Sequence, residues 1–188
     1  ELNGQILWPN NYCMGEVEQA CQLLKMVLDR AKEMQWDDFS GYTMGLYGLA
    51  LLRSGCLGEA HAYFEKGFAQ MEKVGLINFA GYVLYGLGEC ERMGGNLIAS
   101  LVNYQKAVHL RNKRQEYVYL PQLMDGLAKL SLLQDYLAQA ARWFGCADGL
   151  RRKFSMALLI ADRPDYDKHL DLLKQQMSAE ECESAWAE

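Results

Sequence analysis

The chain has 188 residues, of which 51% are hydrophobic and 23% are charged, so it can bury a full core and is not intrinsically disordered. Its formal net charge of -5 argues against a protein that binds the phosphate backbone of nucleic acids through bulk positive charge. No apolar stretch reaches the ~20 residues that a membrane-spanning helix needs. We therefore expect neither nucleic acid nor membrane as a direct partner.

Two further features bear on where the protein works. The six cysteines form no CxxC pair and fall mostly within apolar helical patterns, where Cys usually packs as a small hydrophobic residue. This usage favours a reducing cytoplasm over a disulfide scaffold. The chain begins with Glu1 and has no basic leader followed by an apolar segment, so we expect a piece of a longer cytoplasmic protein.

Helix is predicted over almost the whole chain, because only Pro9, Pro121 and Pro164 could interrupt it. The expected helices, in chain order, cover residues 16–34, 42–53, 57–73, 80–93, 97–113, 120–133, 137–153, 165–177 and 178–186. Breaks such as Ser54-Gly55 and Gly94-Gly95-Asn96 are typical of short turns between antiparallel helices. The predicted fold class is therefore all-α.

The sequence repeats with an offset of 40 residues. The recurring columns include a small residue at Ala20, Ala60, Ser100 and Ala140, and a large one at Leu24, Phe64, Tyr104 and Phe144. A third column holds Gly48, Gly88 and Ala128, and a fourth holds Val27, Gly67, Ala107 and Ala147. One helix pair cannot bury its own apolar face, so four pairs, the first one partial, are predicted to stack into a solenoid over residues 1–155. Small residues let helices approach closely, and the aromatic fills the space between adjacent pairs.

The order small residue, Ala, aromatic, small residue, at spacings of 12, 4 and 3, resembles the tetratricopeptide repeat, lengthened from about 34 residues to 40. HEAT and armadillo repeats have similar periods but lack this order. The resemblance implies a right-handed superhelix. The chain departs from the family at the end of the second helix, where the usual proline is replaced by Lys32, Glu72, Asn112 and Arg152.

The last third of the chain is similar to the C-terminal end of large bacterial signalling proteins. The resemblance lies in the stretches Gln139 to Arg151, Ala161 to Tyr166 and Glu180 to Glu188. Proteins of that family combine a STAND-type ATPase with a LuxR-type or winged-helix DNA-binding domain, or with a cyclase domain, and end in such repeats. The resemblance implies a regulatory module of signal transduction and transcription.

Signatures of catalysis are missing from the sequence. There is no GxxxxGK[ST], HExxH or GxSxG, and Gly86-Leu87-Gly88 has Glu91 where a dinucleotide motif needs its third glycine. His61, His109 and His169 lie far apart, and we expect them at the surface or at helix caps rather than on a metal. The sequence thus predicts no catalytic residue, no cofactor, no metal site and no enzyme activity.

Two basic clusters lie in the last turns of second helices, where positive charge complements the helix dipole. They comprise Arg111, Lys113 and Arg114, and Arg151, Arg152 and Lys153. We expect a solvated face here, because no aromatic residues alternate with the charges as they would in a nucleic-acid site.

The tetratricopeptide resemblance implies that the first helices line an inner wall that binds a partner. The positions that carry over as candidate partner-binding residues are Tyr42, Arg53, Tyr82, Tyr85, Glu89, Arg92, Gln122, Asp125 and Lys129. The spacing 82, 85, 89, 92 places two phenols, a carboxylate and a guanidinium along one stripe of a helix, which can hold a peptide. The alternative is that Tyr82 and Tyr85 pack against the neighbouring pair while the charges solvate the groove.

Residues 156–188 are predicted to cap the solenoid. Ser178 followed by Glu181 forms a capping-box pattern. The apolar stripe of Leu170, Leu173 and Met177, together with Trp186, is expected to cover the flank formed by Leu130, Leu133 and Leu137.

The function that we expect is a non-enzymatic regulatory or sensor module that recognises a protein segment, which could belong to its own ATPase domain. A small-molecule inducer is kept as another occupant. The alternative is a scaffold that self-associates or holds the ATPase inactive without any ligand, so an oligomer stays open.

Overall fold

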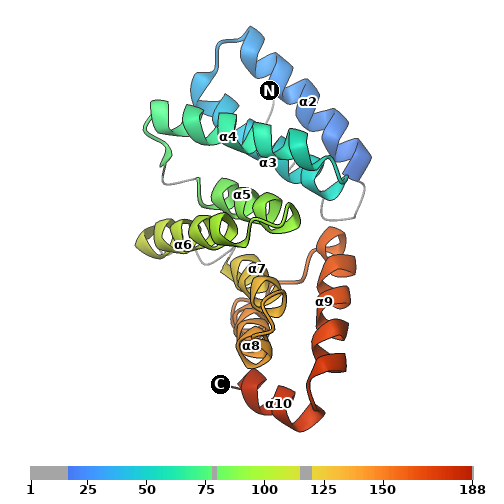
Figure 1. Ribbon diagram of the computed structural model, residues 1–188. Coiled ribbons are helices and arrows are strands. Elements are labelled where there is room, and N and C mark those ends of the chain that lie inside the picture. The colour runs from blue at the N-terminus through green and yellow to red at the C-terminus, as the bar shows by residue number, and fades with distance from the viewer. Residues whose placement is uncertain (1–16, 78–79, 115–119, 188) are drawn as a thin grey trace.

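The computed structural model describes residues 17–77, 80–114 and 120–187, and this part of the chain is helical with no strand (Figure 1). Its α-helices are α2 (Val17–Glu33), α3 (Asp37–Arg53), α4 (Leu57–Lys73), α5 (Gly81–Met93), α6 (Leu97–Arg114), α7 (Leu120–Leu132), α8 (Leu137–Lys153), α9 (Arg163–Gln176) and α10 (Ala179–Ala187). A 3-10 helix, η3 (Ile160–Asp162), precedes α9. The predicted all-α class is confirmed. The largest boundary difference is that α3 begins at Asp37, five residues earlier than expected.

Consecutive helices pack as pairs, and the pairs stack. The helix pairs are α3 with α4, α5 with α6 and α7 with α8, while α4 meets α5 and α6 meets α7 between pairs (Figure 1). The first helices also contact one another, α3 with α5 and α5 with α7, so they form a continuous side of the stack. None of the described helices is long and apolar enough to cross a bilayer.

The helix ends are built alike. The residues Gln35, Gly55, Gly75, Gly95, Asp135 and Ser155 all have positive φ, and neighbours in this series lie 20 or 40 residues apart. At Gly55, the amide of the next residue, Cys56, donates to the carbonyl of Leu51 at 2.9 Å, and the Gly55 amide donates to that of Leu52 at 3.2 Å. This is a Schellman cap, which satisfies two carbonyls at the helix end and reverses the chain.

Large aromatic side chains occupy the contacts between pairs. Phe64 of α4 and Tyr104 of α6 are fully buried. A Cβ atom added to Gly86 would overlap the Phe64 ring, and one added to Gly88 would overlap the Tyr104 ring. Only glycine allows such an approach, so the expectation that the aromatic fills the space between neighbouring helices is confirmed at these two rings.

The last pair has no following pair, and the C-terminal helices supply the missing contacts. Phe144 lies edge-to-face with Tyr166, with ring centroids 5.3 Å apart, and stacks on Trp186 at 6.1 Å. Leu173 is fully buried in the same cluster, together with Leu132. The last pair thus buries its flank under α9 and α10.

Details of the predicted cap are partly confirmed. The capping box forms, because Ser178 Oγ donates to Glu181 Oε2 at 2.6 Å and the Glu181 amide donates to Ser178 Oγ at 3.3 Å. The expected flank is wrong in part. Leu133 is 51% exposed, and Leu130 belongs to the main core instead.

Candidate functional site

A network of buried charges lies on the side of α3, α5 and α7 that carries the predicted binding stripe, and we call this side the inner face. Glu89 of α5 and Lys129 of α7 occupy equivalent positions in successive pairs, and both are about 5% exposed or less. Arg92 Nη2 binds Glu89 Oε2 at 2.8 Å, and Lys129 Nζ lies 3.9 Å from the same oxygen. The Tyr104 hydroxyl donates a short hydrogen bond to Glu89 Oε1. The network therefore ties three helices together.

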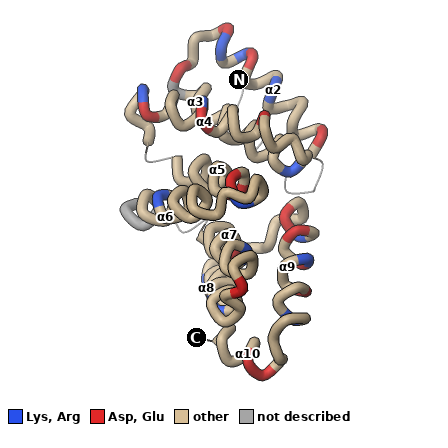
Figure 2. The backbone as a smooth tube through the Cα atoms, viewed as in Figure 1, with Lys and Arg blue, Asp and Glu red and all other residues tan. Residues whose placement is uncertain are grey.

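The chain's own C-terminal part completes this network. Residues 154–162, which we call the return segment, lead from the end of α8 back to α3, and α9 then follows. Arg53 of α3 donates from Nε to Asp162 Oδ1 at 2.6 Å. Lys129 Nζ binds Asp165 Oδ2 at 2.5 Å, and Arg92 Nη2 lies 3.8 Å from it. Figure 2 shows acidic and basic residues at the end of α5 and at the start of α9.

A further ion pair lies beside it. Arg151 of α8 pairs with the Asp125 carboxylate at close range, and its guanidinium lies over the Tyr166 ring, 5.3 Å from the centroid. Arg151 is 8% exposed, so the expectation of a solvated basic face is wrong for this residue. The Arg111 cluster lies outside the described side chains.

Electrostatics fix the charge states of the carboxylates. Burial raises the pKa of Glu89, but Lys129 and Arg92 outweigh burial and hold the pKa of Glu89 well below its usual value. Burial likewise opposes the ionised form of Asp165, and Lys129 lowers its pKa overall. Burial raises the pKa of Asp125 to about 6, although Arg151 acts against this shift. The carboxylates of Glu89 and Asp165 are therefore ionised at neutral pH.

His169 is buried against the same network. Its Nδ1 donates to the backbone carbonyl of Asp165 at 2.7 Å, and burial lowers the pKa of the imidazole. The expectation of a surface or capping histidine is therefore wrong for His169, which packs in its neutral form. His61 is only partly buried, and His109 is exposed.

The charges of these ion pairs balance only with the C-terminal part included. The repeat helices supply four cations, Arg53, Arg92, Lys129 and Arg151, but only two carboxylates, Glu89 and Asp125. Asp162 and Asp165 supply the other two. The helix pairs alone would thus bury a surplus of positive charge, which is costly without counterions.

The predicted tyrosines have packing roles. The Tyr82 hydroxyl donates to the backbone carbonyl of Tyr42 at 2.7 Å, and the two rings lie edge-to-face at 5.4 Å. Tyr85 is buried and stacks on Tyr104 at 6.3 Å. Gln122 Oε1 is buried and has no hydrogen-bond partner among the described residues. These contacts join adjacent helix pairs, as the packing alternative expected.

The structure thus brings together five of the nine predicted residues, namely Arg53, Glu89, Arg92, Asp125 and Lys129. Sequence analysis missed their partners Asp162, Asp165 and Tyr166. The available signal was the acidic pair at positions 162 and 165, on either side of the helix-starting Pro164.

Among the described residues, no group of three or more His, Cys, Asp or Glu side chains is placed to hold a metal ion. No protein-family model, curated protein or solved structure is significantly similar to this chain. The fold and the inner face therefore carry the argument on function. Together they define a protein of stacked helix pairs with a charged inner face covered by its own C-terminal part.

Proposed function

We propose that this chain is a non-enzymatic recognition module that binds a protein segment along its inner face. In this proposal the stack is a right-handed, tetratricopeptide-like superhelix with a 40-residue period and a C-terminal cap. The stacked pairs, the evenly spaced helix caps and the glycine contacts of Phe64 and Tyr104 support this assignment.

The observation that carries the proposal is that the inner face already holds a segment of polypeptide. Asp162 and Asp165, three residues apart, bind Arg53 and Lys129, and Tyr166 lies against Arg151. Charge-assisted hydrogen bonds of this kind are short, strong and directional. A partner segment with the same pattern, two carboxylates three residues apart followed by an aromatic ring, would make the same contacts.

The resemblance to bacterial STAND-type ATPases and LuxR-type regulators suggests the setting. There, a partner segment, from another protein or from the parent ATPase domain, would exchange with the chain's own acidic pair. The exchange would report occupancy to the rest of a cytoplasmic signalling protein.

One observation favours a second function. The segment on the inner face belongs to this chain and continues into α9, whose Leu173 is fully buried. If that segment never leaves, the module is a closed scaffold that braces or self-associates without a ligand.

Peptide binding separates the two functions. A fluorescent peptide with the sequence of residues 158–169 is titrated into the full chain and into its Asp162→Asn/Asp165→Asn variant, in which the internal segment is weakened. We expect the variant to bind this peptide at least tenfold more tightly than a peptide in which both aspartates are asparagine, because Arg53 and Lys129 need carboxylates.

Adding Lys129→Met to that variant should remove most of the preference, whereas Lys73→Met, at a lysine that is 70% exposed, should leave it unchanged. Absence of binding by either peptide to either chain would contradict the recognition function and favour the closed scaffold.

A further inference from the structure

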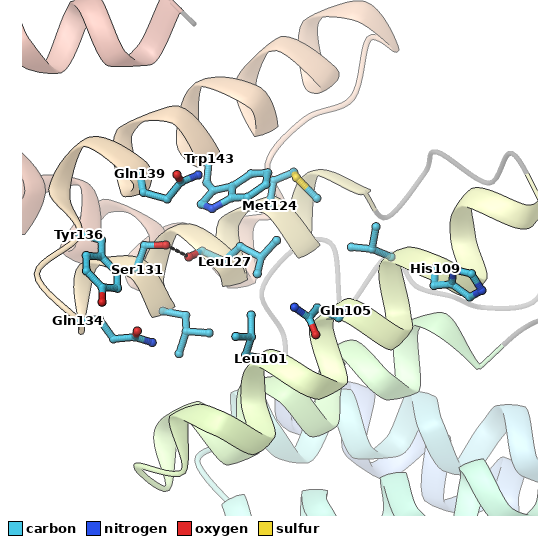
Figure 3. A pocket seen from close by; sticks show the side chains of 12 residues that line it. Leu101, Gln105, His109, Met124, Leu127, Ser131, Gln134, Tyr136, Gln139 and Trp143 are labelled. Carbon is cyan, nitrogen blue, oxygen red and sulfur yellow. Dashed lines mark hydrogen bonds between the residues drawn. The ribbon is translucent and has the colours of Figure 1, made fainter.

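A cavity of about 750 Å³ lies between α6 and the α7–α8 pair (Figure 3). Its α7 residues, such as Leu127 and Ser131, lie about half a helical turn away from Asp125 and Lys129, so the cavity opens on the opposite face of α7 from the ion network. We call it the apolar cleft. Its volume falls in the range of sites for small molecules.

The walls of the apolar cleft are hydrophobic, and its polar groups are neutral. Figure 3 shows the Trp143 ring beside Met124 and above Leu127, with the Gln105 amide across the cleft on α6. None of the 12 lining residues is Asp, Glu, Lys or Arg. The Ser131 hydroxyl already donates to the Leu127 carbonyl at 2.8 Å, so it offers an acceptor rather than a donor.

The preceding groove, between α4 and the α5–α6 pair, differs in its charges. The positions 40 residues before Leu101, Gln105 and Ser131 hold His61, Glu65 and Glu91. There, His61 Nε2 lies 3.1 Å from Glu91 Oε1 and links α4 to α5 across the groove.

In the apolar cleft the corresponding link is absent, because Leu101 and Ser131 cannot form it. The replacement of all three ionisable residues by neutral ones leaves this groove open and uncharged. Its chemistry, rather than its position in the repeat, distinguishes it.

An ion would lose its hydration in the apolar cleft without meeting an opposite charge, so charged ligands are disfavoured. An aromatic ring can lie against Trp143, and the amides of Gln105 and Gln139 can each donate and accept one hydrogen bond or more. We propose that the apolar cleft binds an uncharged, largely apolar small molecule that carries an aromatic ring. This proposal is independent of the recognition function of the inner face.

A pair of matched probes tests the proposal on the full chain. N-phenyl-1-naphthylamine is uncharged and fluoresces more strongly in apolar surroundings, while 8-anilino-1-naphthalenesulfonate has the same ring skeleton with a sulfonate. We expect saturable, one-to-one binding of the neutral probe, at least tenfold tighter than that of the sulfonate. Equal affinities would overturn the proposal, because they would show that charge does not matter at the site.

The variant Leu101→His/Ser131→Glu restores in the apolar cleft the residues that close the preceding groove. It should weaken the neutral probe at least tenfold. The control Ile98→His/Ser184→Glu places the same residues at exposed positions outside the lining, where binding should stay within twofold of wild type. Unchanged binding in the cleft variant would place the probe elsewhere and overturn the proposal.

A second measurement does not depend on the folding of that variant. Energy transfer from tryptophan to the bound neutral probe should fall by more than half in Trp143→Phe. It should change little in Trp36→Phe, whose ring is exposed at the turn between α2 and α3. Equal transfer in the two variants would also overturn the proposal.

Discussion

The two faces of α7 follow opposite chemical rules. On the inner face, Lys129 is buried among Glu89, Arg92 and Asp165, and nearly every charge has an opposite charge within 4 Å. On the other face, the apolar cleft has no charged lining residue. The comparison shows that a conserved packing scheme between helix pairs leaves the surface positions free to diverge, even within one helix of 13 residues.

The two faces also differ in what they demand. A buried cation without a partner is strongly destabilising, so the inner face must be covered by carboxylates, whether its own or those of a partner. An apolar cleft exposed to water has no such requirement and gains only from the burial of apolar surface. The inner face should therefore couple to folding, while the apolar cleft should couple only to its ligand.

The largest expected effect comes from the packing that both faces share. Phe144→Ala should lower the free energy of unfolding by about 3 to 5 kcal/mol, because the fully buried ring leaves a cavity under Tyr166 and Trp186. Chemical denaturation followed by circular dichroism measures it. A loss below about 1 kcal/mol would show that α9 and α10 do not depend on this ring.

On the inner face, Lys129→Met should cost about 2 to 4 kcal/mol, since it keeps the shape of the side chain but leaves Asp165 without its closest cation. Lys73→Met is the matched control, because Lys73 is 70% exposed and 4.0 Å from Asp37, and it should change stability by less than about 0.5 kcal/mol. Equal effects of the two substitutions would show that burial of the network contributes nothing.

The next effect is smaller and isolates α10. A Cβ at Gly145 would overlap the backbone carbonyl of Trp186, so Gly145→Ala should cost about 1 to 3 kcal/mol by displacing α10. Gly149 lies on the same helix with nothing within 4 Å of an added Cβ, and Gly149→Ala should stabilise by up to about 1 kcal/mol. Thermal melts of both variants check the pair, and the same sign for both would contradict the contact.

How far the sequence predicts each region depends on the range of the contacts. Helix positions and the roles of Phe64 and Tyr104 follow from local periodicity and from the 40-residue columns. The cations of the inner face are placed by their helical spacing, but Asp162 binds Arg53 from 109 residues away through an irregular segment. No pattern of period 3.6 or 40 encodes that contact.

The apolar cleft was missed for a different reason. Its signal is the change from His61 and Glu91 to Leu101 and Ser131 in two repeat columns, and the sequence shows this change openly. Only the 3.1 Å contact between His61 and Glu91 reveals that the substitution removes a link between helices.

The smallest expected effect is the pH dependence of the inner face. Burial lowers the pKa of His169, and Lys129 and Arg92 lower it further, while the Asp165 carbonyl and carboxylate act in the opposite direction. A histidine whose folded pKa is lowered stabilises the fold above its ordinary pKa near 6.5 and loses that contribution as the pH falls.

Asp125 titrates with the opposite sign in a neighbouring window, because its folded pKa of about 6 lies above the ordinary value of 3.8. Its stabilising contribution is present at low pH and is lost as the pH rises through about 6. The pH profile of the wild type alone would therefore mix the two groups.

Comparison with His169→Gln separates them, since both proteins keep Asp125. The stability advantage of the wild type over the variant should be largest at pH 7 and should shrink toward pH 5, as measured by urea denaturation at each pH. The two proteins with parallel profiles from pH 7 to pH 5 would show that His169 is not held neutral by its burial. The apolar cleft has no carboxylate in its lining, so binding of the neutral probe should not follow the Asp125 titration.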